Sequence, residues 1–552
     1  MKNIFLISLL LLSLSISAQL SSEKKALFSA FNLPLVVINT SGQAIPDEPR
    51  IVASMKIINN GPDQLNHQFD TPNEYDGKIS IERRGESSAG LPKKSYSLEL
   101  QNADGTNNNV SILGLPVEND FVLYAPYNDK TFMRNVLVYK LYGEMGNWAP
   151  RTKYVEVILN SEYRGIYVLV EKIKRDENRV DIDKLESTDL NYPEITGGYL
   201  MRRDKTSDME PFEYWKSPVQ QIYYEPLTYQ YFDPDYYELE ETQRTYIRDY
   251  MQQFDEMMSG PDFDHPDYGY SAYIDQESFI DMLIINEFSK GLDCYMFSSY
   301  FYKQNDADGG KLFAGPPWDY NISMFNVNYG YDNNIPYVHS WVYDNWSRIY
   351  WWQRLMEDED FEWEVLCRWE ELRHGILAKD NLFSFIDGTA EYLGDAISRN
   401  FETYPILGKY VWPNQEWPNT YSQELNNLKD WIEGRLNWVD GEWGDVCEYV
   451  GTEDEIIIGG ITELEVRIRP NPSNLSNTYL DIKSESGFSS LGIEIFDING
   501  RLIYTETDNA PDNNFNVYSL PDLSYLSEGI YLVRVLNGAE LIHSEKLIKN
   551  NR

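Results

Sequence analysis

Hydrophobic and polar residues alternate along the first third of the chain, and this period of two predicts β-strands. Residues 33–60 alternate short runs of β-formers with turn residues. Residues 78–85 and 93–101 predict two strands around the turn ESSAGLP, and residues 154–173 predict a plain hairpin. The first part of the chain is therefore expected to form a β-rich lobe.

A helical period replaces the alternation in other segments. Residues 129–146 predict a helix closed by Gly146, and residues 276–291 predict another, capped by Asp275 and stopped by Gly291. Further amphipathic stretches lie at 244–258, 346–357, 360–378 and 420–440. The overall pattern predicts an α+β protein in which a β-rich N-lobe precedes a helical C-lobe.

The last part of the chain predicts a separate small β-sandwich. An acidic, glycine-containing stretch supplies a linker at 446–464, and short alternating strands fill 465–552. Asn499-Gly500 and Asn537-Gly538 are typical of type I′ hairpin turns.

The N-terminus predicts export. Lys2 precedes an apolar run from Ile4 to Leu14, and small residues end at Ala18, so residues 1–18 are typical of a secretory signal peptide. The run is too short to span a bilayer. We therefore expect a secreted or cell-surface protein with no membrane span.

Charge and composition exclude several function classes. The formal net charge of −41 would repel nucleic acid and anionic membranes, so neither is an expected partner. The five histidines are scattered, with no HExxH motif and no Ser-His-Asp pattern, which argues against zinc hydrolases and triad enzymes. Cys294, Cys367 and Cys447 give no disulfide framework; three buried thiols are expected, with one bridge as the alternative.

Two carboxylates carry the candidate chemistry. Asp293 follows the predicted helix 276–291, and Asp319 stands in the stretch GPPWDYNIS. The segment between them predicts a hairpin, which would bring the two carboxylates together. A carboxylate pair without a histidine suits either magnesium–phosphate chemistry or glycoside hydrolysis, and both remain open at this point.

A phosphoryl-transfer site also needs a cation and a cradle of donors for the phosphates. The turn after Arg84 offers Ser87 and Ser88, and Lys93 and Lys94 open the next strand. Since neighbouring residues of a strand point to opposite faces, only one lysine can enter a cleft, and we expect it to be Lys94.

The order of the two aspartates is that of protein kinases. Ser298 stands five residues after Asp293, where kinases carry an amide, and Asp319 follows 26 residues after Asp293. Neither a His-Arg-Asp nor an Asp-Phe-Gly motif is present.

Six segments together resemble the CotH family of spore-coat-protein-H-like atypical protein kinases. They are RGESSAGLPKKSYSLEL, DKTFMRN, YRGIYVLVEKI, GGYLM, NEFSKGLDCYMFSSYFY and PPWDYN, in the family's order and spacing, and the likeness spans about residues 33–440. The resemblance implies a two-lobed protein-kinase-like fold. It places a kinase-like domain at 76–445, with a β-rich segment at 30–75 packed on it.

The resemblance also implies roles for single residues. Asp293 matches the catalytic aspartate, and Asp319 matches the aspartate that holds magnesium, with Ser298 beside them. Lys94 would touch phosphate, and Glu171 sits where a kinase hinge would meet adenine. The implied cofactors are ATP and Mg²⁺ (or Mn²⁺).

Two more residues of these motifs, Asn321 and Arg134, carry expectations of their own. Many relatives carry an aspartate where this chain has Asn321, which can still ligate a metal through oxygen but brings no charge. Arg134, from the motif Asp129-x4-Arg134-Asn135, is expected to anchor the helix to the sheet through an ion pair, and a phosphate-facing role is the alternative.

The C-terminal module resembles the sorting domain of the Bacteroidetes type IX secretion system. Its Pro-Asn-Pro start, the segments IEIFDINGRLIY and GIYLVRV, and the near-terminal Lys549 carry this likeness. The resemblance implies the type IX machinery as a partner, with export across the outer membrane followed by release or attachment at the cell surface.

The sequence thus predicts a secreted or surface atypical protein kinase that transfers the γ-phosphate of ATP to Ser or Thr of an exported protein. The main alternative is a catalytically weak kinase-fold module that acts as a surface binding or scaffold protein. Another transfer from ATP, such as adenylylation or glutamylation, is a further alternative.

Overall fold

A computed structural model describes residues 30–552 apart from a set of gaps. The two compact units are Met1–Cys447 and Glu448–Arg552. The predicted signal peptide at 1–18 lies outside the described residues, and no helix within the described part is long and apolar enough to cross a membrane. The gaps are 63, 86, 220–227, 330–336, 346–349, 445–463, 470–478, 485–489, 498–500, 509–514, 521–522, 524, 527–528, 538–539 and 550–552.

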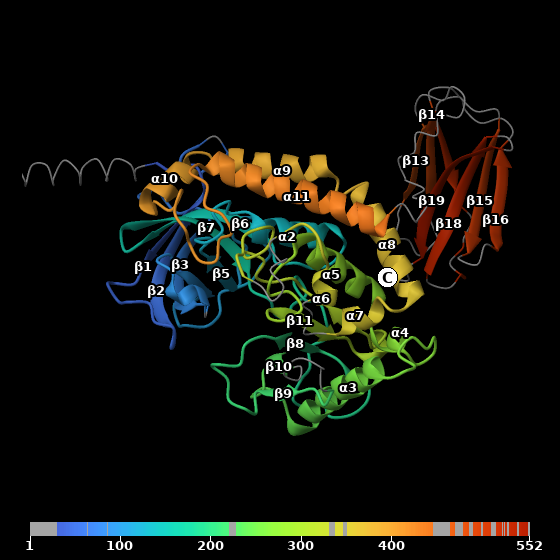
Figure 1. Ribbon diagram of the computed structural model, residues 1–552, viewed down its shortest axis with the longest axis horizontal. Coiled ribbons are helices and arrows are strands. Elements are labelled where there is room, and N and C mark those ends of the chain that lie inside the picture. Colours follow the sequence, from blue (N-terminus) through green and yellow to red (C-terminus); the bar gives the residue numbers. More distant parts are fainter. Residues whose placement is uncertain are drawn as a thin grey trace, which may run out of the picture. The chain divides into compact units, whose positions relative to one another are not determined.

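Seven strands at the start of the first unit form a closed barrel (Figure 1). The predicted hairpins β3–β4 and β6–β7 are present, and a parallel pairing of β1 with β6 closes the barrel. Alternating apolar residues such as Ile38, Met55 and Ile79 fill the interior. The barrel contains both the strands of segment 30–75 and those that follow it. In barrel order the strands are β1 (Leu35–Asn39), β2 (Ile51–Ile58), β3 (Tyr75–Arg84), β4 (Ser95–Gln101), β5 (Asp120–Tyr124), β7 (Glu162–Glu171) and β6 (Thr152–Leu159).

A five-stranded sheet follows the barrel in the first unit. The predicted hairpin between Asp293 and Asp319 is confirmed, because Phe301 of β11 pairs with Ala314 of β12 in antiparallel register. On its other side β11 pairs with β8, about 100 residues upstream, which the local sequence pattern does not predict. The sheet runs β12 (Leu312–Ala314), β11 (Ser299–Lys303), β8 (Tyr199–Arg203), β10 (Thr228–Asp233) and β9 (Tyr214–Lys216).

Helix α5 (Gln276–Ser289) is the central helix of the helical part, and nearly all of its residues are buried. Asp275 caps it as predicted, since its carboxylate accepts a hydrogen bond from the Ser278 amide. The helix ends one residue earlier than expected, with Lys290 rather than Gly291 in the left-handed conformation.

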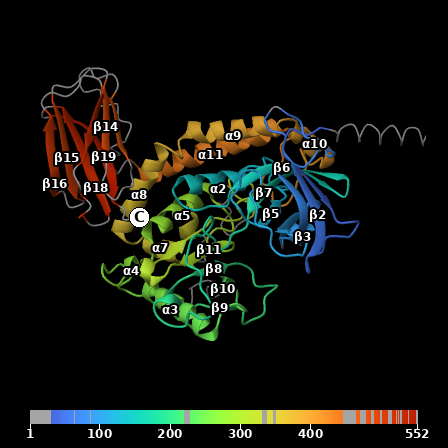
Figure 2. The same ribbon diagram turned by 180° about the vertical axis from the view of Figure 1, so that it is seen from behind.

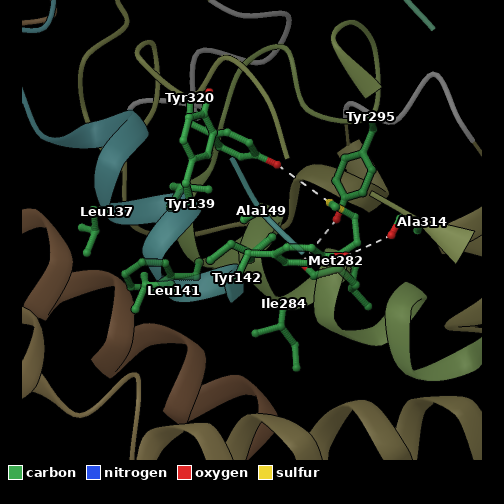
Figure 3. Close-up of a cluster of buried hydrophobic side chains, with 14 of the residues drawn as sticks. Leu137, Tyr139, Leu141, Tyr142, Ala149, Met282, Ile284, Tyr295, Ala314 and Tyr320 are labelled. Carbon is green, nitrogen blue, oxygen red and sulfur yellow. Dashed lines mark hydrogen bonds between the residues drawn. The ribbon is translucent and has the colours of Figure 1, made fainter. Parts of the chain in front are cut away.

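Helix α2 (Arg134–Glu144) packs against α5 and forms the core beneath the candidate site. Figure 3 shows Tyr142 of α2 reaching toward Ala314, whose carbonyl accepts its hydroxyl at 2.9 Å. In the same view the hydroxyl of Tyr320 points to the sulfur of Met282 in α5. The residue after Asp319 is therefore fixed in the core between the two helices.

The remaining helices complete the first unit. Both views show α9 and α11 side by side (Figures 1 and 2). Neither α9 nor α10 was predicted. Of the predicted helix 346–357, residues 351–355 are helical and 346–349 lie outside the described residues. The helices are α3 (Glu241–Ser259), α4 (Tyr270–Tyr273), α6 (Val342–Asn345), α7 (Trp351–Leu355), α8 (Glu359–Arg373), α9 (Lys379–Leu393), α10 (Asp395–Thr403) and α11 (Tyr421–Trp443).

The second unit has two antiparallel sheets. Buried apolar residues such as Leu480, Ile493 and Val533 form its core. The two hairpins predicted from Asn-Gly turns pair as β15–β16 and β18–β19. Asn499, Gly500 and Gly538 lie outside the described residues, and Asn537 is the last residue of β18. The sheets are β13 (Leu464–Arg469), β14 (Tyr479–Ser484) and β17 (Phe515–Ser519), and β16 (Leu502–Asp508), β15 (Leu491–Asp497), β18 (Gly529–Asn537) and β19 (Glu540–Lys549).

The cysteines correct one expectation. Cys367 is disulfide-bonded, whereas Cys294 carries a free thiol whose sulfur lies 2.7 Å from the Gly291 carbonyl oxygen. The prediction of three buried thiols is therefore wrong, and the alternative of one bridge holds. Widely spaced cysteines give no sequence signal for such a bridge, because the pairing depends on the tertiary fold.

Candidate active site

A cleft of about 650 Å³ lies where the barrel meets the helical part of the first unit. Asp293 and Asp319 both line it, as do Ser88, Ser298 and Asn321. The structure thus brings together five of the residues that the sequence analysis singled out. Their supporting elements are the turn after β3, the loop between α5 and β11, and the loop after β12.

The loop that carries Asp293 is held in a strained conformation. The amides of Met296 and Phe297 donate to the Asp293 carbonyl at 2.9 and 2.8 Å. Tyr295 and Ser298 have positive φ values of 64° and 49°, which cost free energy for residues other than glycine. Such strain persists only where the surroundings over-determine the backbone, and it is typical of functional loops.

Buried ionic contacts supply that support. Tyr295 donates its hydroxyl to Glu287 of α5 at 3.1 Å, and Glu287 pairs with the fully buried Arg435 of α11 at 3.4 Å. Lys290 donates to the carbonyl oxygens of Tyr337 and His339 at 3.1 and 2.5 Å. The loop is therefore tied to two helices and to the segment before α6.

Trp318 explains the position of Asp319. The Trp318 ring stacks on Tyr139 of α2 with centroids 5.9 Å apart, and the Arg84 guanidinium lies 5.2 Å from the Trp318 ring centroid. Asp319 itself has a φ of 68°, and its amide donates to the Tyr139 hydroxyl at 3.2 Å. These contacts join the end of β3, helix α2 and the Asp319 loop at the cleft.

The Asp319 carboxyl is electrostatically unusual. Burial raises its pKa to about 6, and the nearby charge of Asp204 raises it as well, while Arg84 and Lys205 lower it. Burial in turn lowers the pKa of the Arg84 guanidinium. A half-buried carboxyl with a raised pKa in a cleft is a functional-site candidate, because a bound cation would favour its charged form.

A network of asparagines fixes the loop after Asp319. The side-chain amide of Asn321 donates to the Asn128 side-chain oxygen at 3.1 Å, which turns the Asn321 oxygen away from Asn128. Asn326 donates to the Asn321 carbonyl at 2.7 Å, and Asn414 donates to the Asn128 carbonyl at 2.7 Å. Asn128 and Asn321 both line the cleft.

Arg134 has a structural position. It pairs with Asp129 at 2.6 Å, and both side chains are buried. Its other nitrogens donate to the carbonyls of Ser323 and Met324, each at 3.0 Å. The expected ion pair is present, and it ties α2 to the loop after Asp319 rather than to the sheet.

Two predicted site residues do not line the cleft. Glu171, at the end of β7, is fully buried. Its carboxylate accepts hydrogen bonds from the Arg151 guanidinium at 2.7 and 2.9 Å and from the Arg151 amide at 2.9 Å. Lys94 is absent from the cleft lining, and Lys93 is buried elsewhere, where it donates to Asn400 of α10 at 3.0 Å. The side chain of Ser87 lies outside the described part of the structure.

The cleft contains charged residues that the sequence analysis missed. Arg84, Arg202 and Lys205 bring positive charge, and Asp204 and Asp208 bring further carboxylates. Arg84 ends β3, and the other four belong to the polar run RRDKTSD at 202–208, which begins in the last two residues of β8. The place of this run in the cleft depends on the pairing of β8 with β11.

The turn after β3 has a glycine for a steric reason. Gly85 has a φ of +93°, and a Cβ at this position would lie 2.1 Å from the Ser88 hydroxyl oxygen. Glycine therefore lets the turn close beside Arg84 and Ser88, at the edge of the cleft.

Within the described residues, no three His, Cys, Asp or Glu side chains gather closely enough to hold a metal ion alone. A cation at Asp319 would therefore be held by fewer than three such side chains of the described residues. This is the usual situation for Mg²⁺, which proteins often bind through one or two carboxylates together with the phosphates of a substrate.

Comparisons with known proteins match two families to the chain. Residues 467–550 match the family described as a secretion system C-terminal sorting domain, which marks the protein for type IX export to the cell surface or for secretion. A search of curated proteins found no matching relative. Residues 81–439 match the family described as CotH kinase protein. Because that match covers more than half of its length, the chain belongs to the CotH kinase protein family.

Proposed function

We propose that this protein is an exported phosphotransferase that moves the γ-phosphate of ATP to a hydroxyl group of an exported acceptor. The observation that carries the proposal is the meeting of Asp293 and Asp319 in one cleft with the cations Arg84, Arg202 and Lys205. Phosphoryl transfer needs positioning and charge stabilisation more than covalent chemistry, and this side-chain set can supply both. Family membership supports the same reading, with the barrel and the helical part as the two kinase-like lobes.

The phosphate end of the cleft lies around Arg84. A guanidinium binds phosphate oxygens in a fork, and Arg84 is held over Trp318 beside the Ser88 turn. Lys205 and Arg202 extend the positive charge across the cleft. Lys94 was predicted for this task, and Arg84 is better placed for it.

The residues around Asp319 fit a magnesium ion bound with ATP. Burial, together with the charge of Asp204, raises the pKa of Asp319, and a bound cation would favour its charged form. Asn321 and Ser298, whose side chains also carry oxygen atoms, line the same cleft. When bound, Mg²⁺ or Mn²⁺ would offset the charge of the phosphates. Manganese accepts the same oxygen donors.

Asp293 is the residue that acts on the acceptor, at the end of the cleft where the acceptor binds. Its carboxylate orients the attacking hydroxyl and takes its proton as the new phosphorus–oxygen bond forms. The strained loop holds the carboxylate in place before the substrate binds. The acceptor predicted from the sequence is Ser or Thr of an exported protein, and nothing in this arrangement is specific to one kind of hydroxyl.

The test is transfer of label from ATP. The mature chain would be incubated with Mg²⁺ or Mn²⁺ and ATP labelled at the γ or at the α position, together with a periplasmic and surface protein extract. The proposal expects metal-dependent transfer of the γ label that disappears in Asp319→Ala. Transfer of the α label instead would indicate adenylylation, and no transfer with no ATP binding would contradict the proposal.

One observation favours the alternative of a scaffold module with weak catalysis. Neither lysine of the Lys93–Lys94 pair lines the cleft, and Lys93 is engaged with Asn400. A kinase fold that lost its lysine would bind nucleotide weakly. The same labelling experiment separates the two readings, because a scaffold would show neither transfer nor metal-dependent ATP binding.

A further inference from the structure

The mouth of the cleft carries exposed aromatic side chains on the side of Asp293. Tyr329 and Trp412 line the cleft and are 40% and 46% exposed, and their rings stack with centroids 5.6 Å apart and an interplanar angle of 14°. Tyr410 and Trp417, both 47% exposed, form a second pair at 5.3 Å. We call these four residues the aromatic rim.

The aromatic rim is held rigidly. The loop between α10 and α11 that carries three of its members is tied down by the buried Lys130, which donates to the Lys409 carbonyl at 2.8 Å. The buried Asn414 donates to Asn128 and Asn326 at 2.7 and 2.8 Å. Asn328 joins the two halves of the rim, because its amide donates to the Tyr410 hydroxyl at 3.1 Å.

Packing alone does not account for these rings. Large aromatic side chains that stay half exposed forgo much of the free energy that their burial would provide. A rigid cluster of them at the mouth of a cleft is typical of a ligand-binding surface. Asp293 lies close enough that its charge contributes, after burial, to raising the pKa of Tyr329 to about 12.

We infer that the aromatic rim binds a neutral carbohydrate and that the acceptor hydroxyl of this enzyme belongs to a glycan. The inference rests on the proposed phosphotransferase function and names its substrate class. The C–H face of a sugar ring packs on flat aromatic rings, and its hydroxyls bond to planar amides and carboxylates. Both kinds of group meet here, since Asn128 and Asp293 line the cleft beside Tyr329 and Trp412.

The arrangement of the strands argues against an extended peptide as the acceptor. Peptides are commonly bound by adding a strand to a free sheet edge. The barrel is closed, and no residue of the edge strands β9 and β12 is among those that line the cleft. Recognition at this mouth therefore depends on side chains.

The charge of the protein also disfavours an acidic acceptor. The chain carries a formal net charge of −41, and Asp293 stands at the acceptor end of the cleft. At that end, away from Arg84, the Asp293 carboxylate would repel an acidic group of a glycan or protein and would not repel a neutral sugar.

The reaction balances without a further reagent. The oxygen of a sugar hydroxyl forms a bond to the γ-phosphorus of ATP, and the bond from that phosphorus to the bridging oxygen breaks. ADP leaves with the electron pair, and the hydroxyl proton passes to the Asp293 carboxylate and then to water. The product is a sugar phosphate monoester.

The test compares acceptors and rim variants on the full mature chain. Cellohexaose, xylohexaose and mannohexaose would be offered with γ-labelled ATP and Mg²⁺, beside a Ser/Thr-rich unstructured peptide. Trp412→Ala and Tyr329→Ala remove the stacked pair, and Trp412→Phe keeps a flat ring. The matched control is Trp363→Ala, since Trp363 of α8 is 52% exposed and is not part of the cleft lining.

The inference expects label on at least one oligosaccharide. Trp412→Ala and Tyr329→Ala should lower that labelling at least tenfold through the acceptor KM, with Trp412→Phe between them and the wild type and Trp363→Ala within twofold. Thermal melting shows that the variants remain folded. Label on the peptide alone, or rim variants equal to Trp363→Ala, would overturn the glycan inference and leave the phosphotransferase standing. No label on any acceptor together with no ATP binding would overturn the proposed function itself.

Discussion

Two aspartates of the first unit, the buried Asp129 and the half-buried Asp319, have opposite surroundings. Asp129 accepts a hydrogen bond from the Thr131 hydroxyl at 2.6 Å and from the Arg134 amide at 2.9 Å, and it pairs with the Arg134 guanidinium. Asp319 has a burial-raised pKa of about 6, with Arg84 placed over the neighbouring Trp318 ring. A carboxylate that is paired and hydrogen-bonded stabilises the fold, whereas one whose pKa is raised in a cleft is a candidate for binding a ligand. Asp129 is therefore expected to serve stability, and Asp319 is expected to serve ligand binding.

The largest expected effect concerns Asp293. Asp293→Asn keeps the shape of the side chain but removes the group that takes the hydroxyl proton, so kcat should fall about 10²- to 10⁴-fold. Steady-state transfer assays would measure it. ATP affinity should change little, because Asp293 is placed at the acceptor end. A kcat within threefold of the wild type would remove Asp293 from the chemistry.

The structural role of Asp129 is tested by Arg134→Met. The change leaves Asp129 buried without its cation and frees the carbonyls of Ser323 and Met324, so the free energy of unfolding should fall by about 3–5 kcal/mol. Urea denaturation at pH 7 measures this change. Arg83→Met, at an exposed position of β3, is the control and should stay within about 0.5 kcal/mol. Equal stability of the two variants would show that the Asp129–Arg134 pair is not structural.

A third prediction concerns the cation at the phosphate end. Arg84→Met removes a charged donor to phosphate, which is worth about 1.5–3 kcal/mol, so the KM for ATP should rise about 10- to 100-fold. Lys94→Met should change it less than threefold, because Lys94 is not among the residues that line the cleft. If Lys94→Met had the larger effect, the original prediction from the sequence would be the better one.

The smallest effect is a gain in stability. A carboxyl whose pKa is higher in the folded than in the unfolded state is protonated more readily when folded, so it costs stability as the pH rises from about 4 through about 6. Asp319→Asn removes that cost. The variant should be more stable than the wild type at pH 7.5 by at most about 3 kcal/mol, and by less at pH 5.

Thermal or urea unfolding at the two pH values measures the gain from Asp319→Asn. Adding ATP and Mg²⁺ should raise the stability of the wild type and not that of the variant. A variant that is less stable than the wild type at pH 7.5 would mean that Asp319 has complete partners in the free protein, as Asp129 does.

The parts of this site that are local in sequence were predictable. The hairpin between Asp293 and Asp319 follows from alternation and a turn, and the cap at Asp275 follows from its residue type. These signals were enough to assign both aspartates to one site, and the structure shows them lining one cleft.

What could not be predicted depends on long-range pairing. The barrel closes through a parallel contact between β1 and β6, which are more than 100 residues apart, and no local signal marks it. The pairing of β8 with β11 places Asp204 and Lys205 at the cleft for the same kind of reason. The role of Lys94 stays a prediction; Lys94 is not among the residues that line the cleft, whereas Arg84, at the end of the preceding strand, is.

The most direct test of the central claim is calorimetric titration of ATP into the mature protein with Mg²⁺, with and without the Asp319→Ala change. The account predicts binding of the wild type in about the micromolar range, at least tenfold weaker binding of the variant, and a similar loss when EDTA removes the metal. Equal ATP binding by wild type and variant, or binding that ignores Mg²⁺, would contradict the assignment of Asp319 as the carboxylate that holds the nucleotide-bound cation.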